Sequence, residues 1–327
     1  MVIKILNALI AIVGGVVGAI ILYFLLNKLA ELLPGRWEDR VKPFLFLLPA
    51  LAAITLYLIY PTIQTVVFSF ANAASTEFVG ASNYGNLLSS SAFQNTLFNT
   101  LLWIIVVPAG TIVLGLLIAT LADRMRPRSE KLAKTLIFLP LAIGGVSAAA
   151  IWRFVYASNP PGQKQVGLLN GIWTGLGGQP VNWLQISTLR ANSLLLMVIL
   201  LWIQAGFAMV LLSAAIKGVP TETLEAARLD GAGEGAIFFR IVIPQIRTTL
   251  ITVFITVLIG VLKTFDIVYV MTNGNFNTNV IAVDFFNQLF TNNNAGYAAA
   301  IVVMLLIIMI PILVFQIRQF RAEEAAR

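Results

Sequence analysis

Residues 217–244 read KGVPTETLEAARLDGAGEGAIFFRIVIP, and long apolar segments lie on both sides of them. The pattern predicts two short helices joined by a glycine turn. Pro220 and Thr221 open the first helix. Glu222 and Glu225 fall in its first turn, where carboxylates interact favourably with the helix dipole.

Two glycines form the predicted turn. We expect Gly231 and Gly233 to end the first helix, because glycine takes the positive-φ conformations that a tight reversal needs. The second helix has an apolar face that includes Ile237 and Ile241, and Pro244 suits the first turn of the helix that follows. An ordinary amphipathic loop between two membrane helices has the same composition, so composition alone leaves both interpretations open.

The composition is that of an integral membrane protein. The 327 residues are 59% hydrophobic and 11% charged, with a mean hydropathy of +0.90, whereas a soluble domain has about 25% charged residues. The chain contains no Cys and no His, which excludes disulfides and removes the commonest general base and metal ligand. We therefore expect no cofactor. The net charge of +7 suits basic cytoplasmic loops better than nucleic-acid binding.

Seven apolar segments are long enough to cross a bilayer, which takes about 20 residues. Their approximate ranges are 4–26, 43–70, 96–122, 134–156, 191–216, 248–271 and 295–317. The first segment is longer than the apolar region of a signal peptide and has no cleavage site after it, so we expect a retained helix. The alternative is an even number of spans, with the first segment lying in the membrane interface.

Basic residues are concentrated in alternate loops. The linker 27–42, the loops 123–134 and 217–247, and the tail all carry Lys or Arg, including Arg318, Arg321 and Arg327. The loops 71–95 and 272–294 carry none, and the loop 157–190 has only Lys164 and Arg190. Positively charged loops face the cytoplasm. The pattern therefore predicts a cytoplasmic C-terminus and 217–244 loop, with the N-terminus outside the cell.

The spacing of the central loop resembles a known motif. Residues 225–227 are Glu-Ala-Ala, Gly231 follows, and the loop ends in Ile241-x-Ile243-Pro244. This pattern resembles the EAA motif of permease subunits of binding-protein-dependent ABC importers, with Ile243 in place of the usual leucine. In that family the loop is the coupling helix, which docks in a cleft of the ATPase subunit.

The resemblance extends over roughly residues 43–318 and is to carbohydrate-uptake permeases of the maltose-permease type. It is carried by residues 95–100, 138–140, 202–217 and 265–274. The nearest likeness is to the alpha-glucoside branch, through residues 152–156, 167–170 and 317–324. One departure is Gly274-Asn-Phe276, where many sugar permeases have Gly-Gly-Pro. That loop is expected to differ in shape.

The resemblance implies an all-α polytopic fold, a type I ABC importer transmembrane domain with six core helices plus one extra N-terminal helix. We expect residues 1–40 to form that helix and a basic linker, and residues 41–327 the transporter domain, with its core at about 95–318. The implied partners are a second homologous permease, two ATPase subunits on the cytoplasmic side and an extracytoplasmic sugar-binding protein, in a bacterial cytoplasmic (inner) membrane. A sugar would be moved by alternating access.

No loop is large enough for a folded soluble domain, and a GxxxxGK[ST] phosphate loop is absent. Any ATP hydrolysis is therefore expected from another subunit, and this chain is not expected to be an enzyme. A secondary transporter or channel is the alternative, but such proteins use intramembrane charges, and few lie in these spans. A membrane enzyme would need a cluster of reactive side chains at membrane depth, and none is visible.

The resemblance assigns ATPase coupling to five residues, Glu225, Ala226, Ala227, Asp230 and Gly231. Matched to the maltose-type pattern, it also places the substrate path at Gly145, Ile203, Gln204, Phe207, Val261 and Thr264. Gln204 and Phe207 suit a sugar best, because sugars need hydrogen-bond partners and flat apolar surfaces. Helix–helix packing is an equal alternative for each residue. The asparagines of 273–279 and 292–294 are interpreted as turn formers, with an exit from the binding protein as the alternative.

Lys263 and Asp266 lie three residues apart, so one helix would place them on one face. A lone charge at membrane depth is costly, and pairing or a wet path avoids that cost. The pair is either structural or borders the sugar path, with Asp266 accepting sugar hydroxyls and Lys263 keeping it ionised.

Overall fold

The computed structural model describes residues 2–325, and helices dominate them. One isolated bridge, between Ala71 and Phe78, is the only β contact in that range. The helices form two compact units, which divide between Val67 and Phe68. The all-α fold predicted from the sequence is confirmed.

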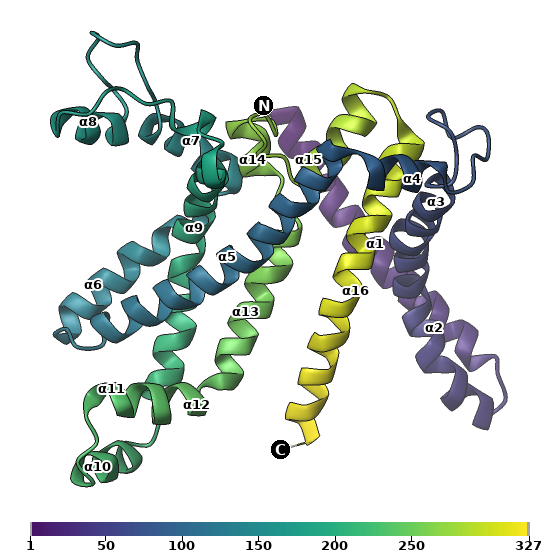
Figure 1. The fold of residues 1–327 in the computed structure, drawn as a ribbon. Coiled ribbons are helices and arrows are strands. Elements are labelled where there is room, and N and C mark those ends of the chain that lie inside the picture. Colours follow the sequence, from purple (N-terminus) through teal and green to yellow (C-terminus); the bar gives the residue numbers. More distant parts are fainter. Residues whose placement is uncertain (1, 326–327) are drawn as a thin grey trace. The chain divides into compact units, whose positions relative to one another are not determined.

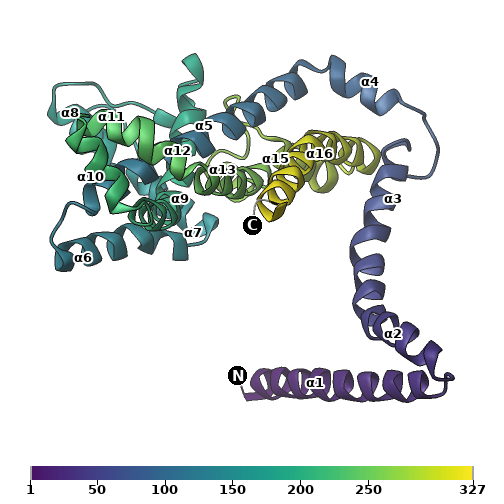
Figure 2. The same ribbon diagram turned by 90° about the horizontal axis from the view of Figure 1, so that it is seen from below.

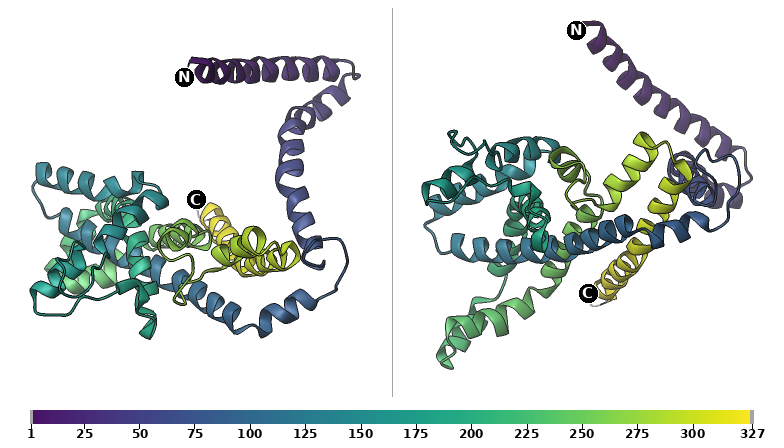
Figure 3. Two further views of the ribbon diagram at one scale, coloured as in Figure 1. Left: turned by 90° about the horizontal axis from the view of Figure 1, so that it is seen from above. Right: turned by 45° about the horizontal axis from the view of Figure 1, so that its top comes forward.

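The first unit consists of two long helical segments. Its elements are α1 (Val2–Glu31), α2 (Arg36–Ile54), a π-helical turn (Thr55–Ile59) and α3 (Tyr60–Phe68). Both α1 and the continuous segment Trp37–Phe68 are long and apolar enough to cross a membrane (Figure 3). The rings of Tyr23 and Phe46 stack at 5.6 Å and join the two segments. The first two predicted spans are therefore helices.

The second unit carries the remaining helices. The long ones are α5 (Ser91–Ala122), α9 (Ala191–Lys217), α13 (Arg247–Leu262) and α16 (Ala295–Ala325). The shorter ones are α4 (Ser82–Ser89), α6 (Pro127–Phe138), α7 (Gly145–Val155), α8 (Leu168–Gly175), α10 (Thr221–Leu229), α11 (Glu234–Ile237), α12 (Ile243–Gln245), α14 (Asp266–Met271) and α15 (Ile281–Phe286). Within this unit α10 and α11 lie at one end of α9 and α13, and α8, α14 and α15 lie at the other (Figure 1).

The core of the second unit lies where α5 packs against α9 and α13 (Figures 2 and 3). Its largest fully buried side chains include Trp103, Leu196, Met197, Ile199, Met209, Leu212 and Val253. A second cluster joins α4, the start of α5, α15 and α16 through Leu87, Phe93, Ile281 and Ile301.

Glycine allows two helix pairs to approach closely. A Cβ on Gly115 of α5 would lie 2.6 Å from the Ala208 Cβ of α9. A Cβ on Gly206 of α9 would lie 2.5 Å from the Ile137 carbonyl oxygen of α6. Small residues bring membrane helices together in this way. The packing of α9 therefore depends on the absence of side chains at both positions.

The Gly206→Ala variant is expected to be destabilised by about 1–3 kcal/mol, because backbone has to move to admit the added methyl group. Gly110→Ala is the control, since a Cβ there would lie 3.0 Å from the flexible end of the Leu201 side chain. Thermal unfolding of the two purified variants in detergent measures the difference. Equal unfolding temperatures of the two variants would contradict the conclusion that the packing of α9 requires glycine at position 206.

Five helices of the described range can each cross a membrane, or up to seven spans when two bent pairs count as one span each. The predicted span at 134–156 is bent in the structure. Helices end around Ala142 and restart at Gly145, and the two directions differ by 107°. Pro140 lies in the 3₁₀ turn Leu139–Ala142, and Ile143 and Gly144 are extended. Proline removes a backbone donor and so favours such a break.

The helix of the predicted span at 248–271 is also interrupted. It ends at Leu262, Lys263 has φ −100° and ψ 9°, and a new helix begins at Asp266. Lys263 and Thr264 donate to carbonyls three residues earlier, at 3.2 and 2.9 Å, which closes the end of α13. At the other end, the segment Glu234–Gln245 meets α13 at 69°.

Candidate functional site

The loop between α9 and α13 forms the predicted pair of helices. Pro220 precedes α10, which begins at Thr221, as the sequence predicted. Glu222 lies in its first turn, but Glu225 lies one turn further on and is exposed. The expectation that Glu225 belongs to the first turn was wrong, because the helix begins at Thr221 and not later.

The reversal after α10 takes place at a single glycine. Gly231 has φ +80°, and nothing lies within 4 Å of where its Cβ would be. Gly233 has φ −71° and is extended, so the expectation of positive φ at both glycines holds only for Gly231. Glycine is therefore needed at position 231 for its left-handed backbone conformation, and not because a side chain would clash with a neighbour.

An ion pair closes this hairpin. The Arg228 Nε in the last turn of α10 donates to Glu234 Oε1 in the first turn of α11, at 2.8 Å. Both side chains are at least half exposed, so their attraction is weak and screened by salt. Leu229 beside them is 89% exposed. The tip of the loop therefore presents an uncovered apolar side chain between charged ones.

The opposite side of the loop packs against the transmembrane helices. Val219, Ile237, Val242 and Ile246 are buried in one cluster, and Ala227 packs against them. Glu225, Ala226 and Asp230 are exposed. Among the predicted coupling residues, Ala227 thus belongs to the internal packing of the loop, and the other side chains face outward.

A charged network lies at the base of the loop. Lys134 Nζ of α6 lies 2.6 Å from Asp123 and 2.7 Å from Glu130. Lys217, the last residue of α9, contacts the same two carboxylates. Ser213 donates to Asp123 at 2.8 Å. The two positive charges of the lysines balance the two negative charges of the carboxylates. These ion pairs connect α6 and the ends of α5 and α9 at the point where the loop begins.

A second polar cluster lies at the far end of α9. Arg190 has φ +58° and donates to Asn95 at 2.7 Å and to Asn99 at 3.1 Å. Its guanidinium also lies 5.1 Å from the centre of the Phe98 ring. Asn99 is fully buried and donates to the Asn279 carbonyl at 3.0 Å. The start of α5 and the start of α9 thus hold one loop between them.

That loop, residues 272–280, has four residues at positive φ, Asn273, Gly274, Phe276 and Asn277. Thr272 and Thr278 share a hydrogen bond of 2.6 Å across it. Asn293 also has positive φ, and the Asn294 side chain accepts from the Tyr297 amide at the start of α16. These contacts confirm the interpretation of the asparagines as turn formers.

Comparison with known proteins identifies the family. The profile described as "Binding-protein-dependent transport system inner membrane component" matches residues 111–321. The chain belongs to this family of permeases. It is 46% identical over 289 residues to the alpha-glucoside transport system permease protein AglF of Rhizobium meliloti, covering 88% of this chain and 85% of that one. It is 45% identical over 283 residues to the osmoprotective compounds uptake permease protein GgtC of Synechocystis sp., covering 86% and 100%.

The fold of this permease is also that of a solved importer. A bacterial ABC transporter involved in the import of the acidic polysaccharide alginate aligns with a TM-score of 0.73 and 19% identity, over 88% of this chain and 99% of that one. The prediction of a type I importer transmembrane domain is confirmed. ABC permease subunits translocate a substrate and do not hydrolyse ATP, so this chain is the translocating part of a multi-pass inner membrane transporter.

The predicted path residues of the permease have different environments. Ile203 and Val261 are 7% and 3% exposed, inside the main core. Gln204, Phe207 and Thr264 are half-buried. A Cβ on Gly260 of α13 would lie 3.7 Å from the Gln204 Nε2. The Gln204 amide of α9 therefore faces α13 across a position without a side chain.

The expectation that one helix places Lys263 and Asp266 on one face was wrong. The helix is interrupted between the two residues, and both side chains are exposed. The described residues contain no ion pair that joins them. Asp266 instead faces Gly145, where an added Cβ would lie 3.1 Å from the Asp266 Oδ2. Gly145 is the first residue of α7, so the carboxylate lies at the positive end of a helix dipole.

Three features of the structure were missed from the sequence. The exposed Leu229 had no distinguishing pattern within an amphipathic helix. Lys134 and Lys217 counted only as basic residues that set the orientation, and their ion pairs were not foreseen. Arg190 was counted only as one of two basic residues in an outer loop. Arg190 directly precedes a long apolar segment, and Asn95 and Asn99 lie at the start of another. That arrangement could have indicated the hydrogen bonds between them.

Proposed function

We propose that this permease translocates a small glycoside, such as an alpha-glucoside, driven by separate ATPase subunits. AglF and GgtC support a small polar substrate, and a 27% identical relative is the sulfoquinovosyl glycerol permease protein SmoG of Agrobacterium fabrum. The observation that carries the proposal is the broken helix at 263–265 beside Gly145. Broken helices line the substrate sites of many transporters, because irregular backbone needs a polar surrounding.

The proposed path includes Gln204, Phe207, Thr264, Asp266 and Gly145. Gln204 and Asp266 supply hydrogen-bonding groups, Phe207 supplies a flat apolar surface, and the absence of a side chain at Gly145 leaves room beside the carboxylate. Ile203 and Val261 act in this scheme as packing beneath the path. Lys263 is exposed and contributes positive charge at the edge of the proposed path.

The proposed assembly contains this permease, a second homologous permease, two ATPase subunits and an extracytoplasmic binding protein. A solved relative of the fold is the alginate transporter in complex with an alginate pentasaccharide-bound periplasmic protein, at a TM-score of 0.70. In this assembly Glu225, Ala226 and Asp230 face the ATPase, with Gly231 shaping the turn and Leu229 as the apolar anchor. The coupling loop and the C-terminus lie in the cytoplasm and the N-terminus outside. Arg327, at the end of the tail, lies outside the described residues.

Reconstituted vesicles test the proposal. The purified permease pair is incorporated with its ATPase subunits, and uptake of a labelled alpha-glucoside is measured with and without binding protein. Uptake that needs ATP and the binding protein supports the proposal. If an osmoprotective solute competes fully with the label, as the likeness to GgtC allows, the substrate class is wider than alpha-glucosides. Uptake driven by an ion gradient alone would contradict it.

The Leu229→Ala variant is expected to bind the ATPase several-fold more weakly, because a Leu side chain loses apolar contact area when truncated. Leu176→Ala is the matched control, since Leu176 is 79% exposed after α8 at the other end of the unit. Co-purification of the ATPase at graded salt concentrations measures the loss. Equal binding by both variants would remove Leu229 from the interface.

Residues 1–40 are proposed to be peripheral to transport. The structure starts α2 at Arg36, so removal of residues 1–34 takes away α1 and leaves the second span whole. The shortened chain is expected to assemble and transport with unchanged substrate preference at lower yield. Competition between sugars in reconstituted vesicles checks this, and an altered preference would place α1 near the path.

A further inference from the structure

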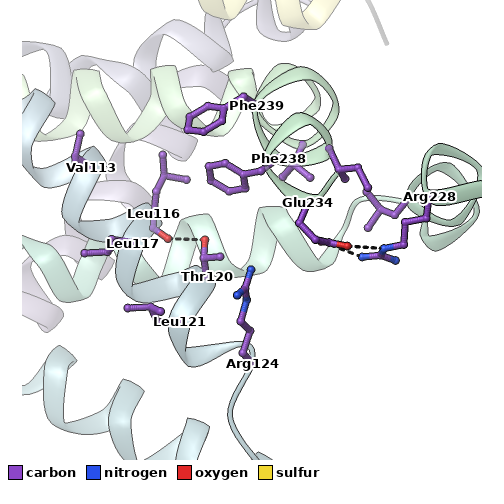
Figure 4. Close-up of a pocket in the computed structure, with 14 residues that line it drawn as sticks. Val113, Leu116, Leu117, Thr120, Leu121, Arg124, Arg228, Glu234, Phe238 and Phe239 are labelled. Carbon is purple, nitrogen blue, oxygen red and sulfur yellow. Dashed lines mark hydrogen bonds and ion pairs between the residues drawn. The ribbon is translucent and has the colours of Figure 1, made fainter. Parts of the chain in front are cut away.

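An apolar groove of ≈ 550 Å³ lies between α5 and the helices of the coupling loop. Its α5 wall includes Val113, Leu117 and Leu121, which are more than half exposed, and its other wall includes Phe238 and Phe239 (Figure 4). Thr120 contributes the hydroxyl on the α5 wall, and it is satisfied by the Leu116 carbonyl at 2.7 Å. The walls therefore offer almost nothing to a polar ligand and much to a hydrocarbon chain.

The groove extends to membrane depth. Val113 lies nine residues before the end of α5 at Ala122, which is about 14 Å along the helix axis. The basic loop that follows marks the membrane surface, and half of the hydrocarbon layer is about 15 Å thick. A water-soluble subunit docked on α10 stays at the surface, so the inner part of the groove needs an occupant from the membrane.

The mouth of the groove is positively charged. Arg228 pairs with Glu234 at the mouth. The hydrogen bond and the charge of Arg228 lower the pKa of the Glu234 carboxyl, and the charge of Arg124 adds to that effect. Two arginines against one carboxylate leave a net positive charge. Within residues 2–325 the Arg124 side chain is exposed and has no hydrogen bond or ion pair, and it points along the groove wall (Figure 4). Arg126 follows in the same turn and Arg128 lies in the first turn of α6, and both are also exposed. A basic mouth on an apolar groove at the membrane surface matches an anionic lipid.

We propose that this groove binds an anionic phospholipid, with an acyl chain between α5 and Phe238–Phe239 and its phosphate at Arg124. The lipid would fill the space beside the coupling loop and so support the position of the α11 segment against α5. The inference uses the cytoplasmic placement of this loop and is independent of which solute the permease carries.

The experiment uses the assembled importer in vesicles of phosphatidylcholine with one fifth phosphatidylglycerol, in which either lipid carries a photoreactive acyl chain. After illumination, labelled peptides are mapped by mass spectrometry, and lipid retained after detergent extraction is counted by native mass spectrometry. Label is expected on residues 113–121 and 238–239. Phosphatidylglycerol is expected to be retained in preference to phosphatidylcholine.

Three variants separate the contribution of the Arg124 charge from that of the apolar groove. Arg124→Gln should lower phosphatidylglycerol retention about fivefold, as expected for one basic residue at a membrane surface. It should lower phosphatidylcholine retention less, because the choline ammonium offsets the charge of the phosphate. Leu117→Trp should fill the groove and lower retention of both lipids. Arg321→Gln removes an exposed charge from α16 and should change neither. Retention of the two lipids by the parent in the proportion of the vesicles, or label on the second permease in place of residues 113–121, would overturn the proposal.

Discussion

Gly231→Val is expected to reduce ATP-dependent uptake about tenfold while the permease still inserts in the membrane. Gly231 has φ +80°, and a left-handed conformation costs an ordinary residue about 1–2 kcal/mol, with β-branched side chains the least tolerant. No atom lies within 4 Å of the added Cβ, so a steric clash does not contribute. The loop relieves the strain by changing the turn, and this separates Arg228 from Glu234.

Two matched variants isolate the conformational cause. Gly231→Asn should retain most uptake, because asparagine tolerates the left-handed region. Gly233→Val also adds a side chain where nothing lies within 4 Å, but at φ −71°, and should be nearly neutral. Uptake and co-purification of the ATPase are measured for all three. If Gly233→Val is as damaging as Gly231→Val, bulk at the interface and not the turn is responsible.

The coupling loop could be predicted because its signals are local. Pro220 starts a helix and Gly231 reverses the chain, and both effects are properties of the residue itself. The approximate positions of the apolar segments could be predicted for the same reason, since hydropathy depends on composition alone. The charge asymmetry of the loops likewise needs no knowledge of the fold.

The break at 263–265 was not predicted. Its residues include neither proline nor glycine, and the charges of Lys263 and Asp266 were interpreted as two neighbours on one helix face. The packing of α14 against α7 is a tertiary contact, supported by the bond from Arg153 to the Val270 carbonyl at 3.0 Å. The bend at Gly144 had a visible cause in Pro140, yet a proline is also found inside α5 and α16 without a break. Whether a proline interrupts a membrane helix depends on its neighbours.

Asp266→Asn is expected to leave the complex assembled and to lower sugar uptake about tenfold or more. A hydrogen bond to a charged group contributes roughly 1.5–3 kcal/mol, and each 1.4 kcal/mol is tenfold in affinity. The side chain is exposed in the single subunit and has no partner of opposite charge among the described residues. A structural role in an ion pair with Lys263 is therefore disfavoured, and Lys263→Met alone should not prevent assembly.

Gly145→Val tests the same site from the opposite helix. Its Cβ would lie 3.0 Å from the Asp266 Cβ, so the carboxylate has to move even though its charge is kept. If Asp266 contacts sugar, Gly145→Val and Asp266→Asn should both raise the sugar concentration needed for half-maximal uptake. Gly144→Val serves as control, since nothing lies within 4 Å of its Cβ and its φ is −66°. The double variant Lys263→Met with Asp266→Leu removes both charges. Full transport by that apolar variant would show that Asp266 does not contact the substrate, because a leucine side chain cannot accept a hydrogen bond from a sugar hydroxyl.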